Sequence, residues 1–151
     1  VEFAKEYGIH PCHENEKGIY GDIASRCLKL HNAVPGLEGV FDPANFVQCG
    51  QDTLEAWQML HSFVRYMHIK DAKLDGGIVP AGLGAGNISY LLSEYRLQGG
   101  REFTMEPHLA EFAGLGALER EGEQSQVGEF GYASTAAAFD AGVAAFKALV
   151  G

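Results

Sequence analysis

The chain has 151 residues, of which 46% are hydrophobic and 21% charged, a composition typical of one globular domain with a sizeable core. Twenty acidic side chains against eleven basic ones leave a net charge of -9, which argues against a protein that binds nucleic-acid backbones. No apolar run approaches the roughly 20 residues that a bilayer span needs, and three cysteines without CxxC spacing are typical of a reducing compartment. We therefore expect a cytoplasmic protein with no nucleic-acid or membrane partner.

Strand-length apolar runs alternate with helical patterns along the chain. After a short helical segment over residues 1–7, strands are predicted over residues 9–12, 37–41, 63–69 and 102–105. Apolar residues three and four positions apart predict helices over residues 23–30, 54–60, 88–95 and 133–150. Four successive βα units predict an α/β fold with a parallel sheet, and residues 1–151 are expected to form a single domain.

Polar residues mark the expected helix starts. Asp22, Asp52 and Asn87 precede the first three helices and are predicted N-caps. The last helix is rich in alanine and is expected to carry one apolar face, made of Phe139, Val143, Phe146 and Val150.

Two architectures fit four βα units, a doubly wound sheet and part of a (β/α)8 barrel. A doubly wound fold often carries a glycine-rich phosphate turn after its first strand, but here residues 13–16 read His-Glu-Asn-Glu. Polar residues instead follow every strand, where barrel enzymes place their chemistry. The sequence therefore favours a TIM-barrel type of fold with about four βα units.

The ends of the four strands carry three carboxylates and one imidazole: Glu14, Asp42, His68 and Glu106. Neighbouring parallel strands end at the same edge, so these side chains are expected to converge at the mouth of the barrel. Oxygen ligands with one nitrogen suit a divalent cation such as Mn, Mg, Co or Zn, which would also hold the carboxylates ionised. His13, beside Glu14, is expected to face the opposite side of its strand.

Four short motifs carry a family resemblance: residues 14–16, 41–46, 68–71 and 106–109. In their order and spacing they resemble the sugar phosphate isomerase/epimerase family, which has a xylose isomerase-like TIM barrel. The resemblance covers roughly residues 10–109, and the motifs look like those of the family's fifth to eighth strands. It implies that this chain corresponds to the C-terminal half of such a barrel, without the first four strands.

The resemblance also implies a metal-dependent activity. It assigns Glu14, Asp42, His68 and Glu106 to a divalent metal, and it makes Glu14 and Glu106 the catalytic pair that moves protons. The implied enzyme is an isomerase or epimerase of small sugars or sugar phosphates that works through an enediolate. The sequence leaves open which sugar and which metal, and whether the product is an isomer or an epimer.

Three further residues are expected near the substrate. Asn45 stands where related proteins often have His, and its amide suits a substrate hydroxyl. Lys70 is expected to pair with a phosphate or hydroxyl, and Asp71 to orient Lys70 or cap its loop. His108 is placed in the substrate-binding set or among the residues that support it. The glycine-rich segment 79–86 is expected to bring backbone close to the substrate.

Two alternatives stay open at this stage. The first is an apurinic-site endonuclease-like phosphodiesterase, which needs additional His and Asp ligands that residues 77–82 lack. The second is a non-catalytic fragment that binds a sugar or a metal. Because half a barrel has two open sheet edges, we also expect a homo-oligomer, most simply a dimer.

Overall fold

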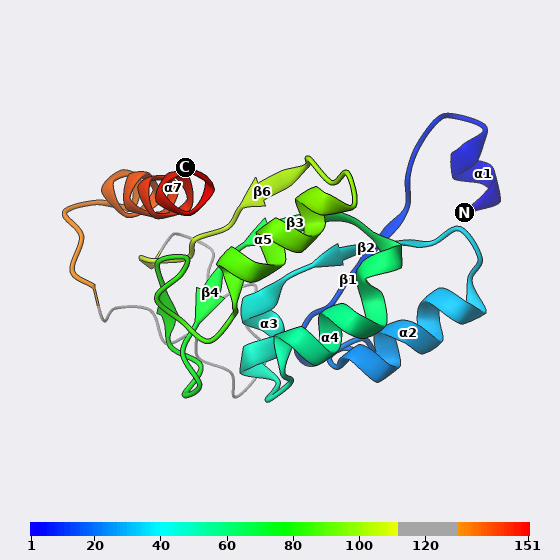
Figure 1. The fold of residues 1–151 in the computed structure, drawn as a ribbon, viewed down its shortest axis with the longest axis horizontal. Coiled ribbons are helices and arrows are strands. Elements are labelled where there is room, and N and C mark those ends of the chain that lie inside the picture. The colour runs from blue at the N-terminus through cyan, green and yellow to red at the C-terminus, as the bar shows by residue number, and fades with distance from the viewer. Residues whose placement is uncertain (112–129) are drawn as a thin grey trace.

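The computed structural model describes residues 1–111 and 130–151 (Figure 1). Four strands form the main sheet: β1 (Cys12–Glu14), β2 (Glu38–Phe41), β3 (Val64–Ile69) and β6 (Phe103–Met105). The helices are α1 (Glu2–Lys5), α2 (Ala24–Ala33), α3 (Pro43–Gln48), α4 (Thr53–Leu60), the 3-10 turn η1 (His61–Phe63), α5 (Ile88–Leu97) and α7 (Thr135–Val150). A hairpin of β4 (Asp71–Ala72) and β5 (Ile78–Val79) follows β3.

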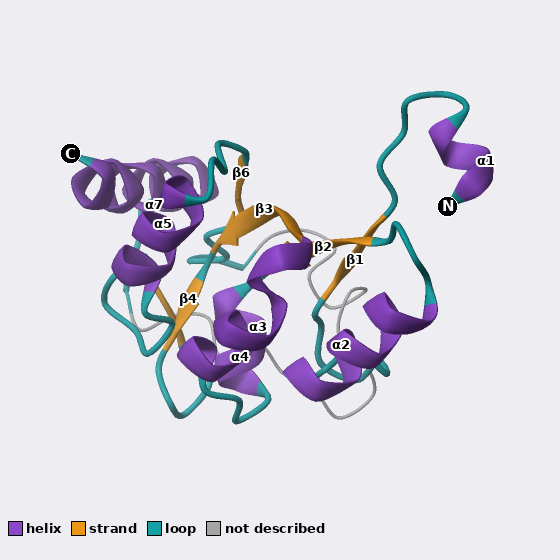
Figure 2. Ribbon diagram, turned by 45° about the vertical axis from the view of Figure 1, so that its right-hand side comes forward, coloured by secondary structure: helices purple, strands orange, loops and turns teal. Residues whose placement is uncertain are grey.

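All neighbouring strands of the main sheet are parallel, in the order β1-β2-β3-β6. Helices α2, α4 and α5 cover one side of this sheet, and α7 lies beside α5 (Figure 2). The core between them contains Phe41 and Met67 from the strands, with Trp57, Leu91 and Tyr95 from the helices. This arrangement confirms the α/β fold with four βα units. No helix in the described ranges is both long enough and apolar enough to cross a bilayer.

Only one of the three predicted side-chain caps is made. The Asp52 carboxylate accepts hydrogen bonds of 2.9 Å from the backbone N–H groups of Leu54 and Glu55, as predicted. The prediction for Asp22 is wrong, because α2 begins after Ile23 and Asp22 instead forms an ion pair with Arg26.

Asn87 does precede α5, but the prediction that its side chain caps this helix is also wrong. The residue adopts a left-handed conformation with φ 54°, and the side chain makes no capping bond. Its amide donates to Thr53 Oγ1 at 2.9 Å, at the start of α4. Asn87 therefore links the N-terminus of α5 to the N-terminus of α4 and does not cap α5.

Helix α7 packs through small residues. Ala138 and Gly142 are buried, whereas Phe139 is 47% exposed, so the predicted apolar face was wrong for Phe139. A Cβ on Gly142 would lie 2.5 Å from the Pro107 Cβ, which shows how closely the helix approaches the chain after β6. Phe146 does pack against the core, as predicted.

The first strand begins later than predicted. Residues 9–11 precede β1 rather than forming it, and Pro11 has no N–H to contribute to the ladder. The short helix α3 and the β4–β5 hairpin were not predicted, because each is too short to show a period. The shift of β1 makes Glu14 the last residue of a strand.

Candidate metal centre

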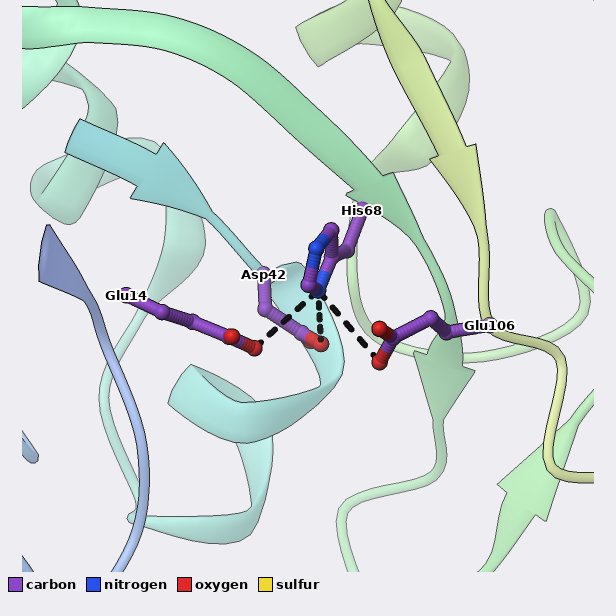
Figure 3. A group of neighbouring side chains, drawn as sticks. All are labelled: Glu14, Asp42, His68 and Glu106. Carbon is purple, nitrogen blue, oxygen red and sulfur yellow. Dashed lines mark ion pairs between the residues drawn. The ribbon is translucent and has the colours of Figure 1, made fainter. Parts of the chain in front are cut away.

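Four side chains at the carboxyl ends of the parallel strands converge on one point (Figure 3). Glu14 ends β1, Asp42 directly follows β2, His68 lies near the end of β3 and Glu106 directly follows β6. One ligand atom from each lies within 4.8 Å of all the others. Among the described residues, no second cluster of His, Cys, Asp or Glu of this kind occurs. The structure thus brings together all four residues expected to bind metal.

His68 stands at the centre of the cluster. Its Nδ1 lies 3.0 Å from Glu14 Oε1, 3.3 Å from Glu106 Oε2 and 3.6 Å from Asp42 Oδ2. This nitrogen is buried, yet none of the three contacts has the geometry of a hydrogen bond. In this arrangement a protonated His68 ring pairs with the three carboxylates, and a metal ion that binds the same four side chains would have to displace that proton. Three oxygens and one nitrogen fit Mn, Mg, Co or Zn.

Each carboxylate of the cluster has a positively charged neighbour. Burial alone lowers the pKa of His68, but the carboxylates of Asp42, Glu106 and Glu14 raise it to about 12. Burial favours the neutral form of Asp42, but the Lys70 ammonium and the His68 imidazole hold its pKa below the usual range. The contact with His68 likewise lowers the pKa of Glu106, against the effect of burial. Both carboxylates are therefore ionised and able to bind a cation.

The two carboxylate oxygens of Asp42 have different partners: one caps a helix and the other faces the cluster. Oδ1 accepts a 2.9 Å hydrogen bond from the backbone N–H of Asn45 and so caps α3, which has Pro43 in its first turn. Oδ2 faces Lys70 Nζ at 3.3 Å and His68 Nδ1 at 3.6 Å. Because the side chain is fully buried, these contacts determine its orientation.

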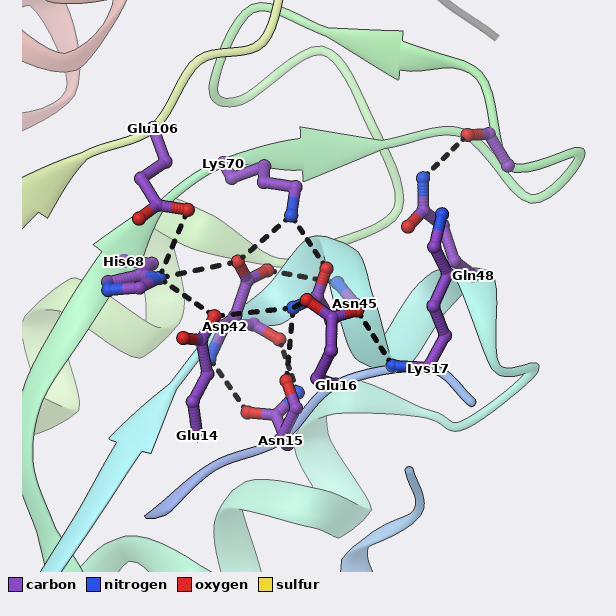
Figure 4. Close-up of polar contacts among 11 residues, drawn as sticks. Glu14, Asn15, Glu16, Lys17, Asp42, Asn45, Gln48, His68, Lys70 and Glu106 are labelled. Carbon is purple, nitrogen blue, oxygen red and sulfur yellow. Dashed lines mark hydrogen bonds and ion pairs between the residues drawn. The ribbon is translucent and has the colours of Figure 1, made fainter. Parts of the chain in front are cut away.

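Asn45 and Lys70 lie beside Asp42, at the edge of the cluster (Figure 4). Lys70 Nζ donates to Asn45 Oδ1 at 2.6 Å, and the Asn45 amide donates to the Asn15 carbonyl at 3.0 Å and to Glu16 Oε2 at 3.2 Å. Burial favours the neutral amine of Lys70, but Asp42 and Glu16 raise its pKa and keep it charged. The expected substrate contacts of Asn45 and Lys70 stay predictions, since both side chains are buried and bond within the protein.

Two histidines near cluster carboxylates in the sequence, His13 beside Glu14 and His108 two residues after Glu106, differ in environment. His108 is half-buried, in a left-handed conformation with φ 43°, and burial together with Lys70 lowers its pKa. Its role toward substrate stays a prediction. His13 faces the helix-covered side of the sheet, where its ring lies against Gly21 and 6.1 Å from that of His31.

Asp71 organises the glycine-rich segment after β5. Its buried carboxylate accepts backbone hydrogen bonds of 2.8–3.0 Å from Ala72, Gly82, Gly84 and Gly86. Asp71 was expected to orient Lys70 or to cap the loop after His68, whereas three of its four backbone hydrogen bonds come from the glycine-rich segment. Because the loop is wound around a carboxylate of the protein, its N–H groups at these positions do not form a phosphate cradle.

Asn15 and Glu16, for which the sequence predicts no role, also belong to the hydrogen-bond network around Asp42 and Asn45. Asn15 exchanges two hydrogen bonds with the backbone of Asp42, and burial raises the pKa of the Glu16 carboxyl. The available signal was their place directly after Glu14 at a strand end. Their partners come from other strands and loops, so only the fold identifies their contacts.

Comparison with known proteins supports the architecture. No family model and no curated protein sequence matches the chain. A solved structure with a similar fold is that of the probable 3-DHS dehydratase AsbF, involved in petrobactin synthesis, from Bacillus anthracis, with 18% identity and a TM-score of 0.67. The match covers 99% of this chain and 52% of that one, so the chain spans about half the length of that protein. The similarity supports the fold expected from the sequence, in which four parallel βα units correspond to about half of a (β/α)8 barrel.

Proposed function

We propose that this chain is the metal-binding half of a TIM-barrel enzyme that removes a proton from the carbon beside a carbonyl in a small sugar or sugar phosphate. The observation that carries the proposal is the convergence of Glu14, Asp42, His68 and Glu106 within 4.8 Å. These four residues would hold the divalent metal, which when bound acts as a Lewis acid toward the substrate oxygen.

The two outer carboxylates are suited to proton transfer. Glu14 and Glu106 come from opposite edges of the sheet, and their side chains are 33% and 32% exposed, whereas Asp42 is fully buried. One carboxylate takes the proton from carbon and leaves an enediolate. The other glutamate, which must carry a proton when substrate is bound, gives it to the opposite face of the same carbon in an epimerase or to the neighbouring carbon in an isomerase. In the isomerase the hydroxyl proton also moves to the oxygen of the former carbonyl. In both cases the atoms of substrate and product balance without a further reactant.

A dehydratase is the second candidate, and the fold similarity to a probable dehydratase favours it. The first step is the same removal of a proton beside the carbonyl. The C–O bond at the next carbon then breaks, and the second carboxylic acid protonates the departing hydroxyl to give water. The same two glutamates serve this reaction, so product analysis distinguishes it from isomerisation.

An endonuclease-like function is less well supported. A multi-zinc site needs further His and Asp ligands, but the cluster in the described residues has only four members. Asn45, three residues after Asp42, has an amide that donates to Glu16 and accepts from Lys70. An amide is a poor ligand for a second metal.

Metal binding is the first test. Calorimetric titration of the chelator-treated chain with Mn²⁺ and with Zn²⁺ is expected to show one site. His68→Ala and Glu106→Gln are expected to weaken binding by at least tenfold, because each removes one ligand. The control is Glu55→Gln, at an exposed position on α4. Equal affinity in the wild type and both site variants would contradict the assignment.

Deuterium exchange is the second test. A panel of ketoses and ketose phosphates is incubated with metal-loaded protein in deuterated water. NMR then detects deuterium at the carbon beside the carbonyl, and it also detects any product formed by dehydration of the substrate. Glu14→Gln and Glu106→Gln are expected to lower exchange by about 100-fold or more. Exchange is expected to be weak in the 151-residue chain alone and strong once a longer polypeptide or a second copy completes the barrel mouth, because positioning needs both halves. Metal binding without exchange in a completed barrel supports the non-catalytic alternative.

A further inference from the structure

Asn15 forms a two-point contact with the backbone of Asp42. Its side-chain Nδ2 donates to the Asp42 carbonyl at 2.9 Å, and its Oδ1 accepts from the Asp42 N–H at 2.9 Å (Figure 4). The β1–β2 ladder ends at the pair Glu14 and Val40. Beyond this pair, the Asn15 side-chain amide makes the hydrogen bonds that connect the two segments. It reproduces with a side chain the donor and acceptor of a further strand residue.

This contact satisfies groups that have no access to water. Asp42 is fully buried and Asn15 is 2% exposed, so without the amide the Asp42 N–H would lose this partner, and the Asp42 carbonyl would keep only the 3.4 Å hydrogen bond from the Phe46 N–H. The Asn15 carbonyl also accepts from the Asn45 side chain at 3.0 Å, and Asn45 in turn accepts from Lys70. Asn15 thereby contacts the two residues that surround Lys70.

Asn15 also connects two ligands from different strands. It follows Glu14 directly in sequence and holds the backbone of Asp42 across the sheet. Together with the β1–β2 ladder, this amide therefore fixes the backbone positions from which the Glu14 and Asp42 side chains extend. Asparagine suits the role, because aspartate lacks the donor and glutamine is longer by one methylene.

We propose that Asn15 is a positioning residue of the metal centre, which places Asp42 for coordination through Oδ2 while contacting no metal itself. This inference rests on the proposed metal binding. Outer partners of metal ligands commonly contribute 10–100-fold to metal affinity, and Asn15 is expected to fall within about that range.

The test compares Asn15→Leu and Asn15→Ala with the wild type, using Co²⁺ as the probe. Leucine keeps a similar volume and removes both hydrogen bonds, and alanine leaves room for water if leucine prevents folding. The control is Asn32→Ala, at an exposed position on α2. Calorimetry gives the Co²⁺ affinity, visible absorption reports the ligand geometry, and thermal unfolding in chelator reports the stability of the metal-free fold.

We expect the Asn15 variants to bind Co²⁺ about 10–100-fold more weakly, with an altered absorption spectrum, while Asn32→Ala binds like the wild type. A lower unfolding temperature with unchanged Co²⁺ affinity and spectrum would mean a structural role only and would overturn the inference. If the wild type itself binds no Co²⁺, Mn²⁺ or Zn²⁺, the proposed function fails and this inference fails with it. If the wild type binds and the variants bind equally well, the inference alone fails.

Discussion

The buried charges around Asp42 are arranged so that each anion has a cation beside it. Lys70 and His68 both face Asp42 Oδ2, at 3.3 Å and 3.6 Å. A bound metal would approach the same oxygen, so Lys70 stabilises Asp42 in the metal-free state and would repel a cation in the metal-bound state. Lys70 therefore increases the stability of the fold and decreases the affinity for metal.

Lys70→Met is expected to destabilise the metal-free protein by about 3–5 kcal/mol, because it leaves the buried Asp42 without its neighbouring ammonium. The loss is expected to be smaller with saturating Mn²⁺, because the metal then supplies positive charge beside Asp42. Urea denaturation in chelator and in Mn²⁺ measures both values. Lys29→Met, at an exposed position on α2, is the control and should change neither. An equal loss of stability in chelator and in Mn²⁺ would contradict the idea that a bound metal replaces the positive charge of Lys70 beside Asp42.

At the level of elements, two adjacent residues after β3, Lys70 and Asp71, contact different parts of the molecule. Lys70 points to the candidate metal centre, whereas Asp71 points to the glycine-rich loop that leads into α5. A Cβ on Gly84 would lie 2.3 Å from Asp71 Oδ1 and 2.5 Å from the Ala72 carbonyl. The loop conformation thus requires glycine at this position.

Gly84→Ala is expected to lower the free energy of unfolding by about 1–3 kcal/mol, since the added methyl group must displace Asp71 or the backbone of Ala72. Gly131→Ala is the matched control, because a Cβ there meets nothing within 4 Å. Chemical denaturation of both variants measures the difference. Equal stability of the two variants would show that the loop does not depend on this close approach.

At the level of the whole molecule, the sheet ends in two open edges. Among the described residues, β1 pairs only with β2, and β6 pairs only with β3. Alternate backbone groups along the outer sides of these strands are left to pair with other chains. A second copy or the remainder of a longer polypeptide would cover both edges.

The purified 151-residue chain is therefore expected to self-associate, most simply as a two-fold dimer. Static light scattering over a concentration series should give a mass near twice 16.3 kDa at high micromolar concentration and a lower mass on dilution. A strictly monomeric mass throughout would contradict this prediction.

The sequence by itself determined the order of the four main strands and of the longer helices between them, and it identified the four residues that converge at the candidate metal centre. Both follow from local patterns, because apolar periodicity defines each element and parallel strands bring their ends to one edge. The tertiary structure alone decided which face of α7 is buried, why Asp22 and Asn87 do not cap, and how Asn15 and Asp71 are used. These features depend on partners distant in sequence: Pro107 for Gly142, Thr53 for Asn87, Asp42 for Asn15 and the loop glycines for Asp71. Local periodicity cannot report such contacts, because burial and hydrogen bonding are set by what the fold brings alongside.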